Sequence, residues 1–143
     1  NGAHICEIEI DPDTGVTEIT RYSVVDDVGV VLNPLLLKGQ IVGGVAMGVG
    51  QILKEDINFD ADGQLTTGSF MDYAMPRASH VPDLVTLSHP VPAKTNPLGV
   101  KGCGEAGCAG SMTSVVCCRR DAATKDHLLF VHRWIHSSLD RRR

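Results

Sequence analysis

The chain has 143 residues and a formal net charge of −4, from 13 Lys and Arg against 17 Asp and Glu. Hydrophobic residues make up 43% and charged residues 21%, which is typical of a globular domain and excludes a wholly disordered chain. The mild acidity gives no electrostatic reason to expect nucleic acid or an anionic membrane as a partner.

The first part of the chain predicts a β-hairpin followed by a loop. Apolar and polar residues alternate over residues 4–10, which is the pattern of a half-buried strand. Residues 11–15 form a turn, because its proline presets φ and its glycine accepts a positive φ. Residues 16–25 are the predicted return strand, and residues 26–34 are a predicted loop.

Residues 35–55 predict a helix with an unusual number of glycines. Each glycine in a helix interior lowers the stability of the helix by about 1 kcal/mol relative to alanine. The glycines are Gly39, Gly43, Gly44, Gly48 and Gly50. Four of them are spaced by four residues, so they form a stripe that another backbone or a ligand can approach closely. Two interpretations stay open: a core helix packed tightly on a neighbour, or a surface that holds a bulky cofactor. The apolar stretch, residues 39–53, is shorter than the roughly 20 residues of a bilayer span, so we expect no membrane span.

The rest of the chain predicts short strands, a long loop and a second helix. An Asp-Ala-Asp-Gly turn precedes a predicted strand at residues 64–73, and a second strand is predicted at residues 84–88. Residues 89–110 are rich in proline and glycine and are predicted to be a loop, with a helix starting at Ser111. The pattern predicts an α+β fold in which β-hairpins pack with a glycine-rich helix, with no separate second domain.

One acidic residue, Glu105, lies among small residues in the long loop. Its small neighbours leave the carboxylate unshielded and let the backbone approach a ligand, and the helix that follows offers free N–H groups to an anion. A carboxylate in such a place can act as a general base. The alternative is a solvated Glu on a glycine-rich surface loop, and spacing alone does not choose between the two.

Cysteines and histidines in the second half of the chain raise the alternative of a metal site. The five cysteines are odd in number and contain no C-x-x-C pair, so we expect no disulfide framework and a reducing compartment, the cytoplasm. The ligands of a small Cys/His metal-binding module would come from Cys103, Cys108, Cys117, Cys118, His132 and His136. Their spacing fits no standard zinc module, so buried or incidental thiols account better for the cysteines.

Four stretches together resemble the molybdenum hydroxylases, the family of xanthine dehydrogenase, aldehyde oxidase and aerobic carbon monoxide dehydrogenase. They are Val-Asp-Asp-Val-Gly-Val-Val-Leu-Asn-Pro (25–34), Gly-Gln-Ile-Val-Gly-Gly-Val-Ala-Met-Gly-Val-Gly-Gln (39–51), Thr-Gly-Ser-Phe-Met-Asp-Tyr-Ala-Met-Pro (67–76) and Thr-Asn-Pro-Leu-Gly-Val-Lys-Gly-Cys-Gly-Glu-Ala-Gly (95–107). They follow the order expected near the C-terminus of the large, molybdopterin-binding subunit. The resemblance implies that residues 1–116 are a C-terminal fragment of the second molybdopterin-binding domain of that subunit.

The resemblance implies a reaction and a site. Family members hydroxylate an aldehyde or an N-heterocycle, or oxidise carbon monoxide, with oxygen derived from water, and a glutamate at the position of Glu105 acts as the general base. The molybdenum is held by a pterin dithiolene, for which we expect the cytosine dinucleotide form, and no side chain is expected to bind the metal. The residues expected beside the cofactor are Met47, Gly48, Lys101, Gly102, Cys103 and Gly104. Some members carry Gln at the position of Met47, so an amide contact there is not expected in this chain.

The resemblance also implies partners. Electrons would leave through 2Fe-2S clusters and FAD on partner subunits or domains. The expected partners are the remainder of the large subunit, the FAD-binding and iron–sulfur subunits, and a small-molecule substrate. The chain starts at Asn1, so we expect an incomplete piece that is inactive alone. A folded but catalytically inert remnant is the alternative.

The resemblance ends near Val116, where family members continue as an Asn-Ala-Val-Val-Asp-Ala-like helix and this chain has Cys-Cys-Arg-Arg. We therefore expect residues 117–143 to be a divergent tail, poorly ordered or translated in a shifted reading frame. Codons for Cys-Cys-Arg-Arg, shifted by one base, can encode Ala-Val-Val followed by an acid. A nucleotide sequence whose alternate frame does not encode these residues would exclude the frameshift hypothesis.

Overall fold

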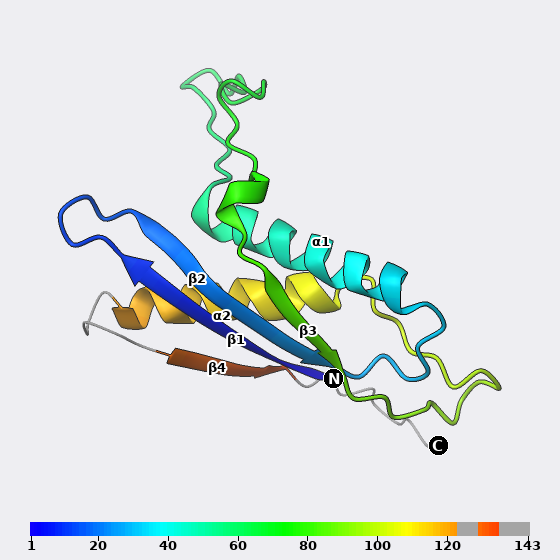
Figure 1. The fold of residues 1–143 in the computed structure, drawn as a ribbon. Coiled ribbons are helices and arrows are strands. Elements are labelled where there is room, and N and C mark those ends of the chain that lie inside the picture. Colours follow the sequence, from blue (N-terminus) through cyan, green and yellow to red (C-terminus); the bar gives the residue numbers. More distant parts are fainter. Residues whose placement is uncertain (123–128, 135–143) are drawn as a thin grey trace, which may run out of the picture.

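The computed structural model describes residues 1–122 and 129–134, which form a mixed sheet with helices packed against it (Figure 1). The sheet has the strand order β3-β2-β1-β4. β1 pairs antiparallel with β2 and with β4, and β2 pairs parallel with β3. The strands are β1 (Gly2–Ile10), β2 (Thr17–Asp26), β3 (Leu84–Ser88) and β4 (Leu129–Trp134).

Two long helices pack together on the sheet. α2 (Ala106–Ala122) lies against β1 and β4, and α1 (Pro34–Leu53) packs along α2 and touches β3. A short 3-10 helix, η1 (Ala78–His80), precedes β3. The helices and the sheet enclose a core of mainly aliphatic residues, as the low aromatic content predicts. The core residues are Cys6, Ile19, Tyr22, Val24, Ile41, Val45, Val49, Val115 and Cys118.

The predicted hairpin is confirmed with slightly longer strands. Gly15, with φ of 71°, supplies the left-handed residue of the turn. Asp11 orders that turn through its side chain, which accepts hydrogen bonds from Asp13 N at 2.8 Å and Thr14 N at 3.1 Å. The pairing shifts by one residue between Glu7 and Ile8. The hairpin thereby supplies the sheet face on which α2 packs.

The predicted glycine-rich helix is present as α1, and Asn33 starts it. The Asn33 side chain accepts a hydrogen bond from Leu36 N at 3.1 Å, and proline follows at the first helical position. The close-packing interpretation fits Gly44 and Gly48, because an added Cβ would lie 3.0 Å from Cys108 N and 2.0 Å from Ser111 Oγ, respectively. Gly43, on the same helix, has open space beside it. One side of the stripe therefore packs on α2 and the other is free.

α1 is longer than the apolar stretch from which we expected no membrane span. It has 20 residues, and within residues 1–122 and 129–134 it is the one helix long and apolar enough to cross a bilayer. The core helix of a globular domain passes the same test of length and composition. In this fold α1 buries Ile41, Val45 and Val49 against the rest of the molecule.

Two sequence expectations are wrong. Residues 64–73 contain no strand; they form turns, with an isolated bridge between Phe59 and Leu65, because no neighbouring strand lies beside them. The second helix begins at Ala106, not Ser111, and continues past Val116 to Ala122. Glycine and alanine in its first turn suggested a loop, but they let this helix approach α1 closely. The rest of the predicted divergent tail, apart from β4, lies outside the described residues.

The contact between α1 and α2 predicts opposite effects for two glycine substitutions. In Gly107→Ala the new Cβ would lie 2.4 Å from Ile41 O and 2.9 Å from Val45 N, so the helices must move apart. We expect a loss of about 1–3 kcal/mol in the free energy of unfolding. The matched control is Gly39→Ala, whose new Cβ would have no atom within 4 Å. Because alanine favours a helix more than glycine does, its free energy of unfolding should rise by up to about 1 kcal/mol. Urea unfolding followed by circular dichroism measures both; equal effects would contradict the packing described.

Candidate functional site

The loop that leads to Glu105 lies against the loop that follows β2. Val30 N donates to Gly99 O at 3.0 Å, and Lys101 N donates to Val28 O at 2.9 Å. Gly29 and Gly99 both have φ of 67°, and a Cβ on Gly29 would lie 2.2 Å from Gly99 O. The two loops therefore meet backbone to backbone, and glycine is required at Gly29 for both its φ and its close approach.

An ion pair fastens the same two loops. Lys101 Nζ lies 2.5 Å from Asp27 Oδ2, and Asp27 Oδ1 accepts hydrogen bonds from Gly29 N at 2.9 Å and Val91 N at 3.0 Å. Burial acts to raise the pKa of Asp27, but the hydrogen bond from Lys101 and those from Val91 N and Gly29 N outweigh it and lower the pKa to about 2. The Asp27 carboxylate therefore stays ionised at neutral pH, and its ion pair with Lys101 fixes the start of the loop that leads to Glu105.

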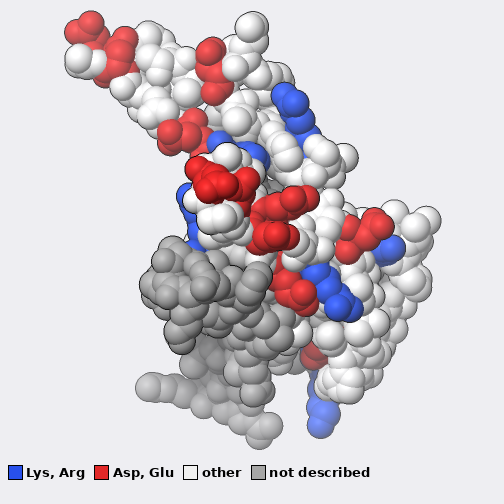
Figure 2. All heavy atoms as spheres, turned by 60° about the vertical axis from the view of Figure 1, so that its left-hand side comes forward, with Lys and Arg blue, Asp and Glu red and all other residues white. Residues whose placement is uncertain are grey.

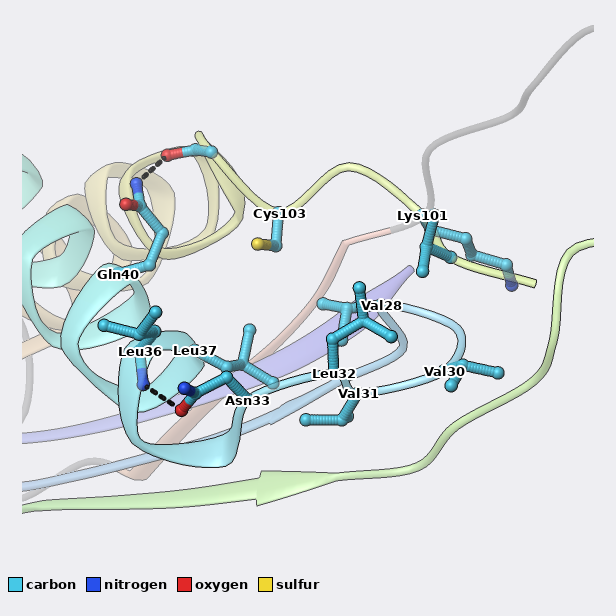
Figure 3. A pocket seen from close by; sticks show the side chains of 12 residues that line it. Val28, Val30, Val31, Leu32, Asn33, Leu36, Leu37, Gln40, Lys101 and Cys103 are labelled. Carbon is cyan, nitrogen blue, oxygen red and sulfur yellow. Dashed lines mark hydrogen bonds between the residues drawn. The ribbon is translucent and has the colours of Figure 1, made fainter. Parts of the chain in front are cut away.

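A side chain of α1 fixes the end of that loop. Gln40 Nε2 donates to Gly104 O at 2.8 Å, immediately before Glu105. Gln40 and Gly104 stand between two hollows and line both of them. The first, called here the apolar hollow, has a volume of about 390 Å³ (Figure 3). Its lining is Val28, Val30, Val31, Leu32, Asn33, Leu36, Leu37, Gln40, Val100, Lys101, Cys103 and Gly104.

The second hollow, called here the Glu105 hollow, has a volume of about 440 Å³ and lies between α1 and the start of α2. Its lining is Gln40, Gly43, Gly44, Met47, Gln51, Gly104, Glu105, Cys108, Ala109 and Met112. Glu105 directly precedes α2, and its carbonyl accepts a hydrogen bond from Ala109 N at 2.9 Å. Its exposed side chain shares this hollow with the free side of the glycine stripe.

Glu105 also affects a neighbour one helical turn away. The pKa of the Cys108 thiol is raised, first by burial and then by the negative charge of Glu105. A thiol with a raised pKa stays protonated near neutral pH, so Cys108 is a poor nucleophile or metal ligand. The carboxylate is therefore the group in this hollow suited to accept a proton.

The structure brings together only some of the residues expected at the site. Met47 and Gly104 share the Glu105 hollow, and Cys103 and Gly104 line the apolar hollow. In Figure 3, Cys103 faces the side chains of α1, whereas the amine of Lys101 points away from them. That amine is engaged by Asp27. Two further expected residues line neither hollow: Gly48, which packs on Ser111, and Gly102, which is exposed.

Sequence reasoning missed two residues that shape the site, Asp27 and Gln40. Asp27 was placed only in a loop, and its partner Lys101 lies 74 positions later. Gln40 is the polar residue beside the first glycine of the stripe, which was a signal that α1 also faces something polar. Pairings at such separations follow from the fold and not from local spacing.

A second cluster of titratable groups lies in the core and is closed to ligands. His4 Nδ1 lies 2.7 Å from the Tyr22 hydroxyl, and His4 Nε2 lies 3.7 Å from Asp26 Oδ1. All three side chains are at most 2% exposed. Burial raises the pKa of Tyr22, which keeps that hydroxyl neutral. The cluster supports the interior and is not a candidate active site.

The metal-module alternative gains no support from the residues whose side chains the structure describes. Among them, no three His, Cys, Asp or Glu side chains gather as a metal site would require. Cys118 is buried, and its thiol donates to Cys6 O at 3.0 Å. Cys103 and Cys108 lie in different hollows. The side chains of His132 and His136 fall outside the described residues.

The Glu105 hollow fits a cofactor that is held by hydrogen bonds and not by side-chain metal ligands. Open space lies beside Gly43 and Gly104, so a large flat group can come close to both backbones. The start of α2 presents backbone N–H groups, which favour a negatively charged group. Gln40 keeps a free amide oxygen, since only its Nε2 atom is used in the hydrogen bond to Gly104.

Comparisons with known proteins agree with this arrangement. Residues 1–82 match the family model described as molybdopterin cofactor-binding domain. The chain is 38% identical to the 6-hydroxypseudooxynicotine dehydrogenase complex subunit gamma of Paenarthrobacter nicotinovorans, and 34% identical to the carbon monoxide dehydrogenase large chain of Hydrogenophaga pseudoflava. Each match covers 85% of this chain and 15% of the relative.

Solved structures agree as well. Quinoline 2-oxidoreductase from Pseudomonas putida 86 superposes with a TM-score of 0.79 and 39% identity. The match covers 81% of this chain and 15% of that chain. This chain therefore spans about one seventh of the length of the proteins it matches.

The Asp27–Lys101 pair predicts an acid-dependent loss of stability. The pKa of Asp27 is lowered from 3.8 to about 2. Its contribution to the free energy of unfolding is therefore fully present above pH 3.8 and is lost as the pH falls toward 2. We expect Asp27→Asn to unfold more easily than the parent at neutral pH, with the difference shrinking between pH 3.8 and 2. Urea unfolding across this range measures it. A difference that is unchanged over these pH values would contradict the ion pair.

Proposed function

The chain belongs to the molybdopterin cofactor-binding domain family, with homologues among the molybdenum hydroxylases, and on this basis we propose that it forms one wall of a molybdenum hydroxylase active site. The observation that carries the proposal is the position of Glu105. Glu105 lies at the start of a helix and lines a hollow bordered by glycines that leave room for a cofactor. The reaction would be hydroxylation of an aldehyde or N-heterocycle, or oxidation of carbon monoxide.

The residues that form and position the Glu105 hollow have proposed tasks. Bound molybdenum–molybdopterin would supply an electron-accepting metal centre, and the backbone at Gly43 and Gly104 would lie against it. Glu105 would take the proton from a water-derived oxygen and hold it on its carboxylate. Gln40 would keep the Gly104 peptide in place, and Asp27 would keep Lys101 and the start of the loop in place, so that the carboxylate stays aimed into the hollow.

The complete enzyme would need more than this chain. We infer as partners the remainder of a large-subunit polypeptide, FAD-binding and iron–sulfur subunits that pass on the electrons, and a small-molecule substrate. The cofactor would be the cytosine dinucleotide form. The odd number of cysteines and the lack of a C-x-x-C pair support a reducing compartment, and we place the assembly in the cytoplasm. This chain alone would be inactive, because it supplies one side of the site.

A folded but inert remnant is the second candidate. Apolar side chains at the start of α1 favour it, because Leu35 is 79% exposed and Leu36 is 70% exposed, with no cover from the part of the chain that the structure describes. The two candidates differ in one measurable property. A catalytic wall restores molybdenum binding and turnover when the missing part is supplied, whereas a remnant restores neither.

The proposed base is tested in a complemented assembly: this 143-residue chain co-expressed with the matched chain of quinoline 2-oxidoreductase that lacks the aligned segment. Glu105→Gln should lower turnover of quinoline by about 10²- to 10⁴-fold, because the amide cannot accept the proton. Molybdenum content, measured by mass spectrometry, should stay unchanged. The matched control is Glu18→Gln, an exposed carboxylate on β2, which should leave turnover unchanged.

Near-normal turnover of the Glu105→Gln assembly would refute the role of Glu105. An assembly of the parent chain that forms but contains no molybdenum would favour the inert remnant. Stoichiometric zinc in the purified parent chain would favour the Cys/His module.

A further inference from the structure

A segment between α1 and η1 projects from the body of the molecule (Figure 1). We call this segment, residues 56–75, the arm. It contains no helix or strand, and its one strand-like pairing is the bridge between Phe59 and Leu65. Tight turns organise it: Gly63 N donates to Asp60 O at 3.1 Å, and Tyr73 N donates to Ser69 O at 2.8 Å. The arm therefore has a defined shape of its own.

The base of the arm is fastened to the end of α1. The Tyr73 hydroxyl donates a hydrogen bond to the Glu55 carboxylate, and this bond is the main cause of the raised pKa of Tyr73. Pro76 packs on α1, where a Cβ on Gly50 would lie 2.8 Å from Pro76 Cγ. The arm thus leaves the body in a fixed direction.

The arm exposes large apolar side chains to an unusual degree. Phe70 is 84% exposed and Met71 is 96% exposed. Ile57 and Phe59 are also mostly exposed. Beside them lies a hollow of about 340 Å³, lined by Ile57, Leu65, Thr67, Gly68, Ser69, Phe70 and Tyr73. A contiguous exposed apolar surface with polar residues around it marks an interaction site.

The charges around this apolar surface have one sign. Residues 56–75 contain four aspartates, namely Asp56, Asp60, Asp62 and Asp72, and no Lys or Arg. Figure 2 shows acidic side chains on the projecting part of the molecule. A partner that covers the arm must therefore bury apolar side chains and offer positive charge at the edge of the contact.

Resting on the proposed function, we propose that the arm docks into an apolar groove bordered by Lys and Arg on the part of the large-subunit polypeptide that lies outside this chain. The relatives are about seven times longer than the matched segment, so most of their polypeptide lies outside it and is available to cover the arm. Permanent interfaces are more apolar than transient ones and resemble a domain core cut in half. The exposure of Phe70 and Met71 fits a permanent contact within one subunit better than a transient contact with a separate redox partner.

Photo-crosslinking in the complemented assembly tests the docking. Phe70→p-benzoylphenylalanine should crosslink to the truncated quinoline 2-oxidoreductase chain, and mass spectrometry should place the crosslink among apolar residues next to Lys or Arg. The matched control is Val16→p-benzoylphenylalanine, at a position that is 62% exposed in the turn between β1 and β2. It should give little crosslink.

Phe70→Ala should weaken co-purification by about tenfold or more, as expected for a buried aromatic anchor. Asp62→Lys should also weaken co-purification, because it reverses a charge at the edge of the contact.

Three outcomes would overturn the docking: no crosslink from position 70, equal crosslinks from positions 70 and 16, or crosslinks to a second copy of this chain. Molybdenum content of the same preparation separates this result from the proposed function. Molybdenum without a crosslink from position 70 overturns the docking alone. A crosslink without molybdenum supports the docking and counts against the proposed function.

Discussion

The close contact between α1 and α2 is the constraint on which the rest of the structure depends. Gly44 and Gly107 let the two backbones touch, and no larger residue fits at Gly107 without displacing α1. This contact places the start of α2, and with it Glu105, beside the free side of the glycine stripe. The glycines therefore weaken α1 as an isolated helix but create both the helix pair and the hollow.

Two polar contacts then fix the loop that holds the carboxylate. The Asp27–Lys101 ion pair fastens the loop at one end, and the hydrogen bond from Gln40 to Gly104 fastens it at the other. Neither Asp27 nor Gln40 needs to touch a substrate to matter. Each restricts where the backbone on either side of Gly102 and Cys103 can go, and a base that must meet a proton at hydrogen-bond distance needs such restriction.

Local patterns in the sequence predicted some features and failed at others for identifiable reasons. Alternating residues predicted β1, the turn after it predicted β2 as the return strand, and the apolar residues that follow the loop at 26–34 predicted α1. The strand expected at residues 64–73 failed because the turn signal before it does not reveal whether a partner strand lies beside it. The start of α2 was missed because glycines that permit helix packing resemble those of a loop. Lys101 was expected beside a cofactor, and its partner Asp27 could be found only from the fold.

The proposed function depends on the aim of one carboxylate at a molybdenum centre. The most direct measurement is a crystal structure of the complemented assembly with an anomalous difference map collected at the molybdenum absorption edge. We expect the molybdenum peak in the Glu105 hollow, within reach of the carboxylate directly or through one water molecule. A peak elsewhere, or a Glu105 side chain turned away from it, would contradict the role of Glu105 as the base.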